Sequence, residues 1–293
     1  MHRNFFMAGM PGSGKTTYLA ALWTLLSEGL TKTMYTRKVG YMPEDNAKLN
    51  QIAYEILSYK DIERTKVEER MKLSLTLMDE NGEDISLSIP DLAGEIFRNL
   101  VKDRQLPKEI VSNLQKSDCI LFFTYYRNMS YEKRIENGSC DIKQTNYTTS
   151  GENDNHAIVN FDNQINEQRE ANESEVVDLL LSLLELLRKS KKTVNIRFIM
   201  SAWDMVEKEY GNEILPETFV EKRFPLLYQC IHSNQEQMNF EFWGVSAIGG
   251  NLADQEDVRR LQSEEINAIR VVSPSGNRSN DLTTLLAEMG DNK

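Results

Sequence analysis

The chain has 293 residues, of which 40% are hydrophobic, so it is long enough and apolar enough to bury a full core. Its formal net charge of −11 argues against nucleic acid or an anionic membrane as the main partner. The three cysteines form no CxxC pair and charged residues interrupt the longest apolar run, which predicts a cytoplasmic protein without a disulfide framework or a membrane span.

The first pattern along the chain is a glycine-rich stretch from Gly9 to Thr16, between an apolar run and an apolar helical pattern. Glycines at its first and sixth positions, followed by Lys and Thr, give the Walker A spacing of a phosphate-binding loop. Backbone N–H groups and the helix N-terminus would hold phosphate oxygens, with Lys15 on the β- and γ-phosphates and the Thr16 hydroxyl on Mg²⁺. The nucleotide contacts predicted here are Gly9, Pro11, Gly12, Ser13, Gly14, Lys15, Thr16 and Thr17.

Strands and helices alternate through the rest of the chain. The predicted strands are 4–8, 71–77, 85–89, 118–126, 194–200 and 240–245, and the predicted helices are 15–27, 44–57, 107–115, 281–289 and segments beginning near 172, 216 and 225. Asn81-Gly82 lies between the second and third strands and is the strongest short signal for an antiparallel hairpin. Asn172 and Glu175 have the spacing of a capping box.

These elements predict an α/β fold. The expected architecture is a P-loop NTPase three-layer αβα sandwich, mostly parallel, with one antiparallel strand contributed by the hairpin. We expect a single domain over 1–293, with a polar surface insertion at about 127–171 and an irregular stretch around Pro274 and Gly276.

The third predicted strand runs directly into Asp91-Leu92-Ala93-Gly94. In a phosphate-loop sheet, a carboxylate at this strand end holds Mg²⁺, commonly through a water. The Gly94 backbone N–H could approach a γ-phosphate, so that the following loop responds to that phosphate. The alternative is a plain strand-to-loop turn that uses Asp and Gly for their turn chemistry.

With these motifs in this order, about residues 3–250 resemble the Ras-like (TRAFAC) class of P-loop GTPases. The resemblance implies that Asp204 bonds the N1 and N2 hydrogens of guanine and that the backbone at Ser246 and Ala247 contacts its O6. The segment around Asp204 lacks the lysine that packs over the base in that class, and Ile248 replaces the lysine of the last motif. Trp203 either covers the base instead or belongs to the core. The implied base contacts are Ala202, Trp203, Asp204, Ser246 and Ala247.

The opening phrase, from Ala8 through the phosphate loop to Trp23, also looks like the bacterial double-GTPase families. Those families are predicted to act in multi-gene bacterial or phage-defence systems. This finer resemblance implies a partner protein, either an effector or a second GTPase.

The switch threonine of the class ligates Mg²⁺ only when the γ-phosphate is present. The resemblance points to Thr65, just before the second predicted strand, with Thr31, Thr33 and Thr36 as alternatives. Arg64 is either a positive charge for the transferring phosphate or a solvated residue of a charged linker. The implied metal ligands are Thr16, Thr65 and Asp91.

Glu95 stands where the class often carries a glutamine that orients the attacking water. A carboxylate is repelled by the negative charge of the γ-phosphate, so we expect hydrolysis to be slow or to be completed by a partner. The implied catalytic residues are Lys15, Thr65, Gly94 and Glu95.

The sequence therefore predicts a switch protein that binds GTP and GDP and hydrolyses GTP with Mg²⁺. Two alternatives stay open. The phosphate loop alone also permits a P-loop ATPase or small-molecule kinase. The second alternative is a scaffold that binds nucleotide without hydrolysing it. In such a scaffold, the nucleotide stabilises the fold and presents loops to another protein.

Overall fold

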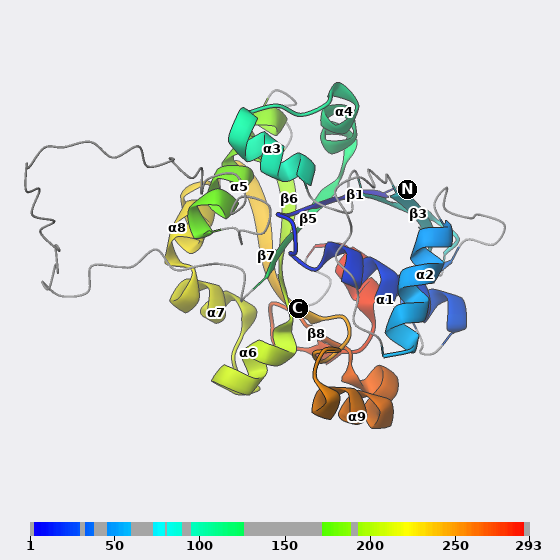
Figure 1. Cartoon of the computed structure of the whole chain (residues 1–293). Coiled ribbons are helices and arrows are strands. Elements are labelled where there is room, and N and C mark those ends of the chain that lie inside the picture. Colours follow the sequence, from blue (N-terminus) through cyan, green and yellow to red (C-terminus); the bar gives the residue numbers. More distant parts are fainter. Residues whose placement is uncertain are drawn as a thin grey trace, which may run out of the picture.

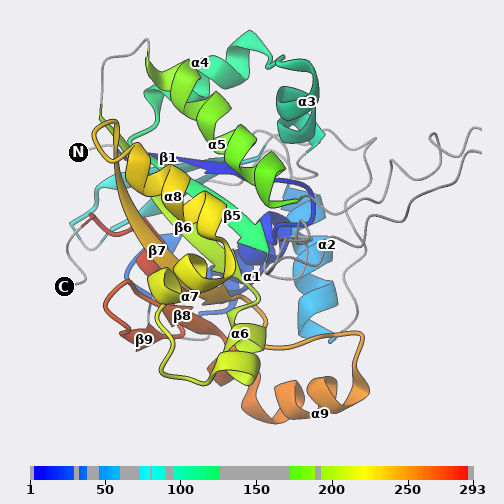
Figure 2. The same cartoon turned by 90° about the vertical axis from the view of Figure 1, so that its left-hand side faces the viewer.

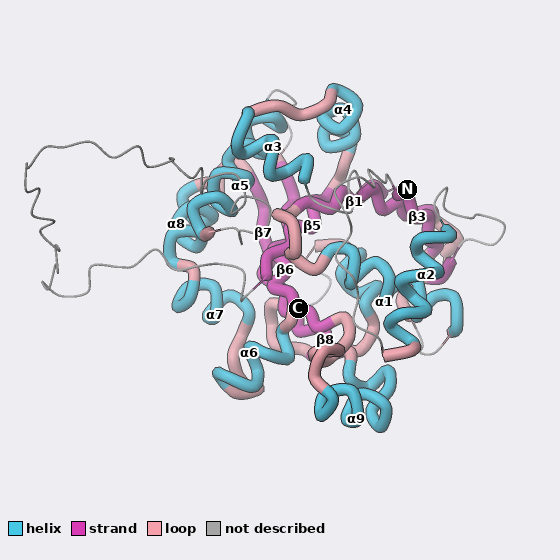
Figure 3. Tube along the Cα trace, viewed as in Figure 1, coloured by secondary structure: helices cyan, strands magenta, loops and turns pink. Residues whose placement is uncertain are grey.

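The structure is a computed structural model that describes residues 3–29, 33–37, 46–59, 73–79, 81–89, 95–125, 172–188 and 193–289. Within these residues the strands form one nine-stranded sheet in the order β2-β3-β4-β1-β5-β6-β7-β8-β9 (Figures 1 and 3). The strands are β1 (Arg3–Ala8), β2 (Thr36–Arg37), β3 (Leu73–Met78), β4 (Asp84–Ile89), β5 (Cys119–Tyr125), β6 (Val194–Ser201), β7 (Met238–Ser246), β8 (Arg270–Val272) and β9 (Arg278–Ser279).

Helices cover both faces of this sheet (Figure 2). They are α1 (Lys15–Glu28), α2 (Asn46–Leu57), α3 (Glu95–Asp103), α4 (Lys108–Lys116), α5 (Glu173–Arg188), α6 (Trp203–Tyr210), α7 (Pro216–Arg223), α8 (Pro225–Ser233) and α9 (Gln255–Glu264), with 3₁₀ turns η2 (Glu265–Ala268) and η3 (Leu282–Leu286). One core cluster joins the sheet to α3–α8, and the other joins it to α1, α2 and η3. The predicted α/β sandwich is confirmed.

The centre of the sheet is parallel, as predicted, from β4 through β1, β5 and β6 to β7. Strand β5 shows why, because six of its seven residues are buried. Ile120 and Phe122 enter one core cluster, whereas Leu121 and Phe123 enter the other. The sequence of a strand that helices cover on both faces is a continuous run of apolar residues.

The predicted hairpin is also confirmed, since β3 and β4 pair antiparallel around Asn81-Gly82. The Asp79 carboxylate accepts hydrogen bonds from the backbone N–H groups of Asn81, at 2.9 Å, and Glu83, at 2.7 Å. These bonds hold the pKa of Asp79 below its ordinary value. Gly82 supplies the positive φ, 80°, that the turn requires.

The helix boundaries follow their local signals. Gly29 ends α1 in the left-handed conformation, and its N–H donates to the Leu25 carbonyl at 3.1 Å. The predicted capping box before α5 is formed in both directions. Asn172 Oδ1 accepts from the Glu175 N–H at 2.8 Å, and Glu175 Oε2 accepts from the Asn172 N–H at 3.0 Å.

The C-terminal part of the chain differs from the prediction. The stretch around Pro274 and Gly276 is not irregular, because β8 and β9 form a hairpin that adds to β7 antiparallel. The sheet thus has antiparallel pairs at both edges rather than one antiparallel strand. The closing helix is the short 3₁₀ turn η3, whose start is capped by Asp281. Strands of two or three residues are too short to show an alternating pattern.

A buried arginine holds η3 against the sheet. Arg197 on β6 is fully buried, and its Nη1 donates to the Leu285 carbonyl at 2.6 Å while its Nε donates to Glu241 at 2.9 Å. Tyr18 on α1 donates its hydroxyl to the Leu282 carbonyl at 3.0 Å. Burial raises the pKa of Tyr18, so this hydroxyl stays a donor. Residues 282–286 therefore cover the side of α1 that follows the phosphate loop.

The predicted insertion at 127–171 lies outside the described residues. In the described part of the chain, no helix is long and apolar enough to cross a membrane.

Candidate functional site

The phosphate loop lies against the carboxyl ends of β5 and β6. Gly9 and Gly14 have φ angles of 146° and 89°. A Cβ atom on Gly9 would lie 2.5 Å from the Phe123 carbonyl oxygen, and one on Gly14 would lie 2.9 Å from the Ser201 Cβ. Both positions therefore require glycine for conformation and for space. Gly14 is also the residue from which α1 begins.

Lys15 is folded back onto this loop and is almost fully buried. Its Nζ donates to the carbonyl oxygens of Gly9, at 2.8 Å, and Met10, at 2.9 Å, and to the Ser13 hydroxyl at 3.1 Å. It also lies 5.9 Å from the centre of the Phe97 ring at the start of α3. A buried ammonium group needs such partners, because its desolvation is costly.

Ser201, the last residue of β6, connects the loop to the sheet. Its Oγ lies 2.9 Å from the carbonyl oxygens of both Ser13 and Thr124, so one hydroxyl hydrogen serves two acceptors. Sequence reasoning gave Ser201 no role. The sequence signal for such a role was its position at the start of the segment that ends in Asp204.

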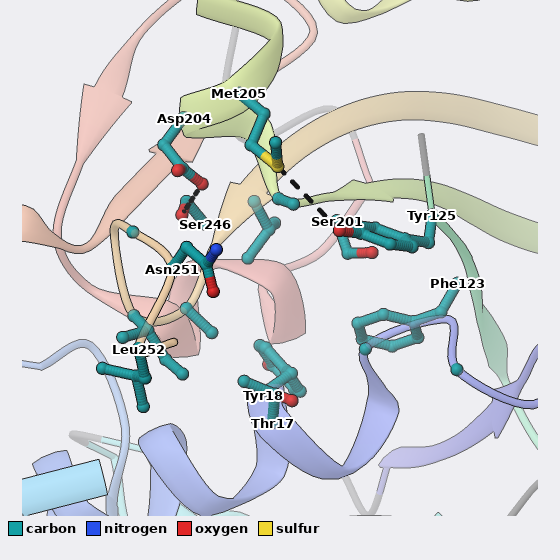
Figure 4. A pocket seen from close by; sticks show the side chains of 17 residues that line it. Thr17, Tyr18, Phe123, Tyr125, Ser201, Asp204, Met205, Ser246, Asn251 and Leu252 are labelled. Carbon is teal, nitrogen blue, oxygen red and sulfur yellow. Dashed lines mark hydrogen bonds between the residues drawn. The ribbon is translucent and has the colours of Figure 1, made fainter. Parts of the chain in front are cut away.

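Asp204 and Ser246 meet at the next point along the same edge of the sheet. Asp204 lies in the first turn of α6, directly after β6, and Ser246 ends β7. Parallel neighbours such as β6 and β7 place their carboxyl ends together, which brings these residues side by side. The Ser246 hydroxyl donates to Asp204 Oδ1 and accepts from the Gly249 N–H at 3.1 Å. Figure 4 shows the two side chains facing each other.

A cavity of about 320 Å³ lies between this pair and the phosphate loop (Figure 4). That volume is within the ordinary range for a small-molecule site. Of the residues predicted to contact nucleotide, the cavity is lined by Gly12, Gly14, Thr17, Ala202, Asp204, Ser246 and Ala247. Its unpredicted lining residues include Tyr18, Phe123, Tyr125, Met205, Ile248, Asn251 and Leu252. The structure thus brings both predicted halves of the site to one cavity.

The loop after Ser246 is held by Asp257 on α9. The Asp257 carboxylate accepts from the Asn251 N–H at 3.0 Å, from Lys208 at 3.1 Å and from Arg260 at 3.2 Å. Burial alone would raise the pKa of Asp257, but these donors hold it below its ordinary value. Arg260 also donates to the Gly249 carbonyl at 2.7 Å. The cavity wall at Asn251 is therefore fixed from outside the cavity.

Trp203 does not line the cavity. Its side chain is fully buried, edge-on to Phe219 with ring centres 5.6 Å apart. It also covers Gly244 so closely that a Cβ there would lie 2.3 Å from the indole. Ala202 has a φ of 55°, and α6 begins directly after it, so Trp203 points into the core while Asp204 reaches the cavity. Of the two alternatives left open for Trp203, the structure shows the one in which its ring belongs to the core.

The switch side of the site is described only in part. Thr65, Asp91 and Gly94, together with Arg64 and Thr31, lie outside the described residues. Thr33 precedes β2, and Thr36 within β2 donates its hydroxyl to the Met78 carbonyl at 3.4 Å. Glu95 is the first residue of α3, and its carboxylate pairs with Arg98 at 3.2 Å.

Of the three predicted Mg²⁺ ligands, Thr16 alone falls in the described part of the chain, half-buried at the start of α1. Within that part, no group of three His, Cys, Asp or Glu side chains could hold a metal. A single hydroxyl next to a phosphate loop suits Mg²⁺, because this ion keeps several waters and takes further ligands from substrate phosphates.

Replacing Ser201 tests the connection between the loop and the sheet. Ser201→Ala removes the donor to two buried carbonyl oxygens and keeps the Cβ that packs on Gly14. We expect about 1–2 kcal/mol lower stability, which corresponds to a Tm lower by roughly 2–8 °C in thermal unfolding. The matched control is Ser263→Ala, whose exposed hydroxyl also bonds a carbonyl. Equal effects of the two variants would contradict the role of Ser201.

Comparisons with known proteins give one family and several solved structures. Among curated proteins none matches the chain. Among solved structures, it is similar to the GTP-bound Ski7 GTPase-like domain of S. cerevisiae, with 14% identity, a TM-score of 0.41, and coverage of 85% of this chain and 44% of that one. It is also similar to the small GTPase Arl6 of Trypanosoma brucei, with 12% identity, a TM-score of 0.38, and coverage of 89% and 99%.

A third solved structure, Era of Aquifex aeolicus bound to GDP and AlF₄⁻, has 13% identity and a TM-score of 0.36 over 89% of this chain and 56% of that one. The chain thus spans about half the length of the Ski7 and Era chains. The model of the Double-GTPase 1 family matches residues 6–289, nearly the whole chain. The chain therefore belongs to the Double-GTPase 1 family of P-loop GTPases, as the resemblance of its opening phrase implied.

Proposed function

We propose that this chain binds guanine nucleotides in the cavity between the phosphate loop and Asp204, and hydrolyses GTP to GDP with Mg²⁺. The observation that carries this proposal is the Asp204–Ser246 pair, which faces a cavity that the phosphate loop lines from the other side. Membership of a GTPase family supports it independently. Slow hydrolysis on its own and coupling to a partner protein, as an effector or second GTPase, are part of the proposal.

At the phosphate end, Lys15 would exchange the carbonyl oxygens of Gly9 and Met10 for β- and γ-phosphate oxygens. The backbone N–H groups around Gly12 and Gly14, together with the N-terminus of α1, supply further positive potential. Thr17, in the first turn of α1, also lines the cavity.

At the base end, Ser246 orients the Asp204 carboxylate by donating to one of its oxygens. Guanine offers two donors, N1–H and the 2-amino group, to such a carboxylate, whereas adenine offers no matching pair. The Ala247 backbone would face the guanine O6. Because Trp203 is in the core, the contacts with the flat faces of the base fall to cavity residues such as Tyr125, Met205 and Leu252.

A bound Mg²⁺ would supply positive charge that offsets the negative charge of the phosphate oxygens. Thr16 is its ligand from the described residues, and Thr65 and Asp91 complete the proposed set. Glu95 would orient the attacking water, helped by Gly94, whose N–H would contact the γ-phosphate. The Arg98 guanidinium partly offsets the negative charge of Glu95. The negative charge that the Glu95 carboxylate retains is the reason that we expect turnover to be slow.

The most direct test compares the binding of GDP, GTP, ADP and ATP with and without Mg²⁺, by calorimetry. We expect the guanine nucleotides to bind more tightly than the adenine nucleotides by a factor of about a hundred or more. The reason is that adenine lacks both hydrogen bonds to the buried carboxylate. Mg²⁺ should strengthen GTP binding. Equal affinity for ATP and GTP would favour the ATPase or kinase alternative. Bound GTP that persists unhydrolysed for days would favour the scaffold.

Replacing Asp204 tests base recognition separately. Asp204→Asn exchanges one acceptor for a donor, which suits the 2-oxo group of xanthine. We therefore expect the preference to move from guanosine to xanthosine nucleotides, with GDP binding weaker by about tenfold or more. Competition between GDP and XDP for a fluorescent nucleotide measures this change. Asp178→Asn on α5, far from the cavity, serves as the control.

Replacing Glu95 tests the hydrolytic step. Glu95→Ala should slow single-turnover GTP hydrolysis by about tenfold or more, because a positioned side chain no longer orients the water. GTP affinity should change little. Asp103→Ala, at the other end of α3, is the matched control. Hydrolysis that is no slower in Glu95→Ala would remove Glu95 from the mechanism.

A further inference from the structure

Glu207 is a buried carboxylate one helical turn after Asp204 on α6. Its side chain is 5% exposed and is held by two arginines of the β8–β9 hairpin. Arg270 Nε donates to Glu207 Oε2 at 3.2 Å, and Arg278 Nη1 donates to Glu207 Oε1. A buried carboxylate with a guanidinium on each oxygen is a strong and directional contact.

Local signals do little to hold α6 in place. The helix has eight residues, and Ala202 at its N-cap has a φ of 55° and makes no side-chain capping bond. A helix this short is marginal by itself and depends on tertiary contacts. Those contacts include Trp203 and Val206 in the core, Lys208 on Asp257, and the carboxylate of Glu207 on the arginines. Asp204 lies between Trp203 and Glu207 in the sequence.

The same hairpin also reaches the base end of the cavity through the sheet. Strand β8 pairs with β7 so that Arg270 lies directly opposite Ser246. Ser246 donates to Asp204, while the Arg270 side chain donates to Glu207. These four residues therefore close a ring in which α6 is bonded to the β7–β8 pair at two points.

Arg278 fixes the far end of the helix. Besides Glu207, it donates to the carbonyl oxygen of Asn212, just beyond Gly211, where α6 ends. The β8–β9 hairpin thus contacts α6 along its length, from the level of Asp204 to its C-terminus. We refer to Glu207, Arg270 and Arg278 as the α6 clamp.

We propose that Glu207 is a positioning residue for recognition of the purine 2-amino group, and that it acts through Asp204. The α6 clamp keeps the helix at the angle at which the Asp204 carboxylate, tied to Ser246, faces the base. Without the clamp, α6 would keep its apolar contacts through Trp203 and Val206 and could tilt about them, so that Asp204 loses its two-point contact with guanine. The phosphate loop is held by Lys15 and Ser201, so it would bind phosphate as before. This inference rests on the proposed guanine site.

The test compares the binding of GDP and IDP, which differ by the 2-amino group alone. In the unchanged protein, GDP should bind about tenfold or more tightly than IDP, since one hydrogen bond to a carboxylate is missing in IDP. In Glu207→Gln and in Arg278→Gln, this GDP preference should fall by about fivefold or more, because GDP loses two hydrogen bonds to Asp204 whereas IDP loses one. Calorimetry with each diphosphate gives both constants.

The matched control is Glu209→Gln, which removes the same charge from an exposed position on the same helix. It should keep the GDP preference of the unchanged protein. The melting temperature of each nucleotide-free variant separates a loss of stability from a loss of discrimination. If Glu207→Gln does not fold, Arg278→Gln carries the test, because Arg278 is 41% exposed.

The outcomes distinguish the two proposals. A lower melting temperature with an unchanged GDP preference in the clamp variants would overturn the positioning role and leave the guanine site intact. An equal fall in GDP and IDP affinity would do the same, because the loss would then not concern the 2-amino group. An unchanged protein that binds neither diphosphate, or binds both equally, would overturn the guanine assignment and this inference with it.

Discussion

The close approach of the phosphate loop to the end of β6 is the contact on which the site depends. Gly14 and Ser201 touch so closely that no side chain fits on Gly14, and the Ser201 hydroxyl reaches the carbonyl oxygens of Ser13 and Thr124. The loop that holds phosphates is therefore fixed to the strand that delivers Asp204. This contact sets the spacing between the phosphate loop and the Asp204–Ser246 pair.

An acidic chain can still present an anion-binding site, because the potential at a site depends on nearby groups. The chain carries a net charge of −11, yet the phosphate loop combines a buried ammonium group, backbone N–H groups and the start of α1. Part of this positive potential comes from backbone dipoles and part from the Lys15 ammonium group. The net charge of a chain thus bears on its binding of large polyanions, but it gives little information about the binding of a small anion.

The sequence predicted the features that a few neighbouring residues specify by themselves. Asn81-Gly82, Gly29 and the Asn172–Glu175 box each specify local geometry by themselves, and the glycine spacing specifies the phosphate loop. The β8–β9 hairpin was not predicted, because its two short strands are stabilised by pairing with β7 and by Glu207, far away in the sequence. The direction of Trp203 was left open for a similar reason, since the positive φ of Ala202 and the space at Gly244 decide it.

The contact of residues 282–286 with Arg197 and Tyr18 has a consequence for the order in which the protein forms. Arg197 lies on the buried face of β6 and needs the Leu285 carbonyl, while Tyr18 needs that of Leu282. Both acceptors leave the ribosome more than eighty residues after Arg197. Until then, a nascent chain holds a charged group on an uncovered sheet face, next to the helix that starts at the phosphate loop. Residues 282–286 therefore complete the cover of β6 and α1 only after all nine strands of the described sheet have been synthesised.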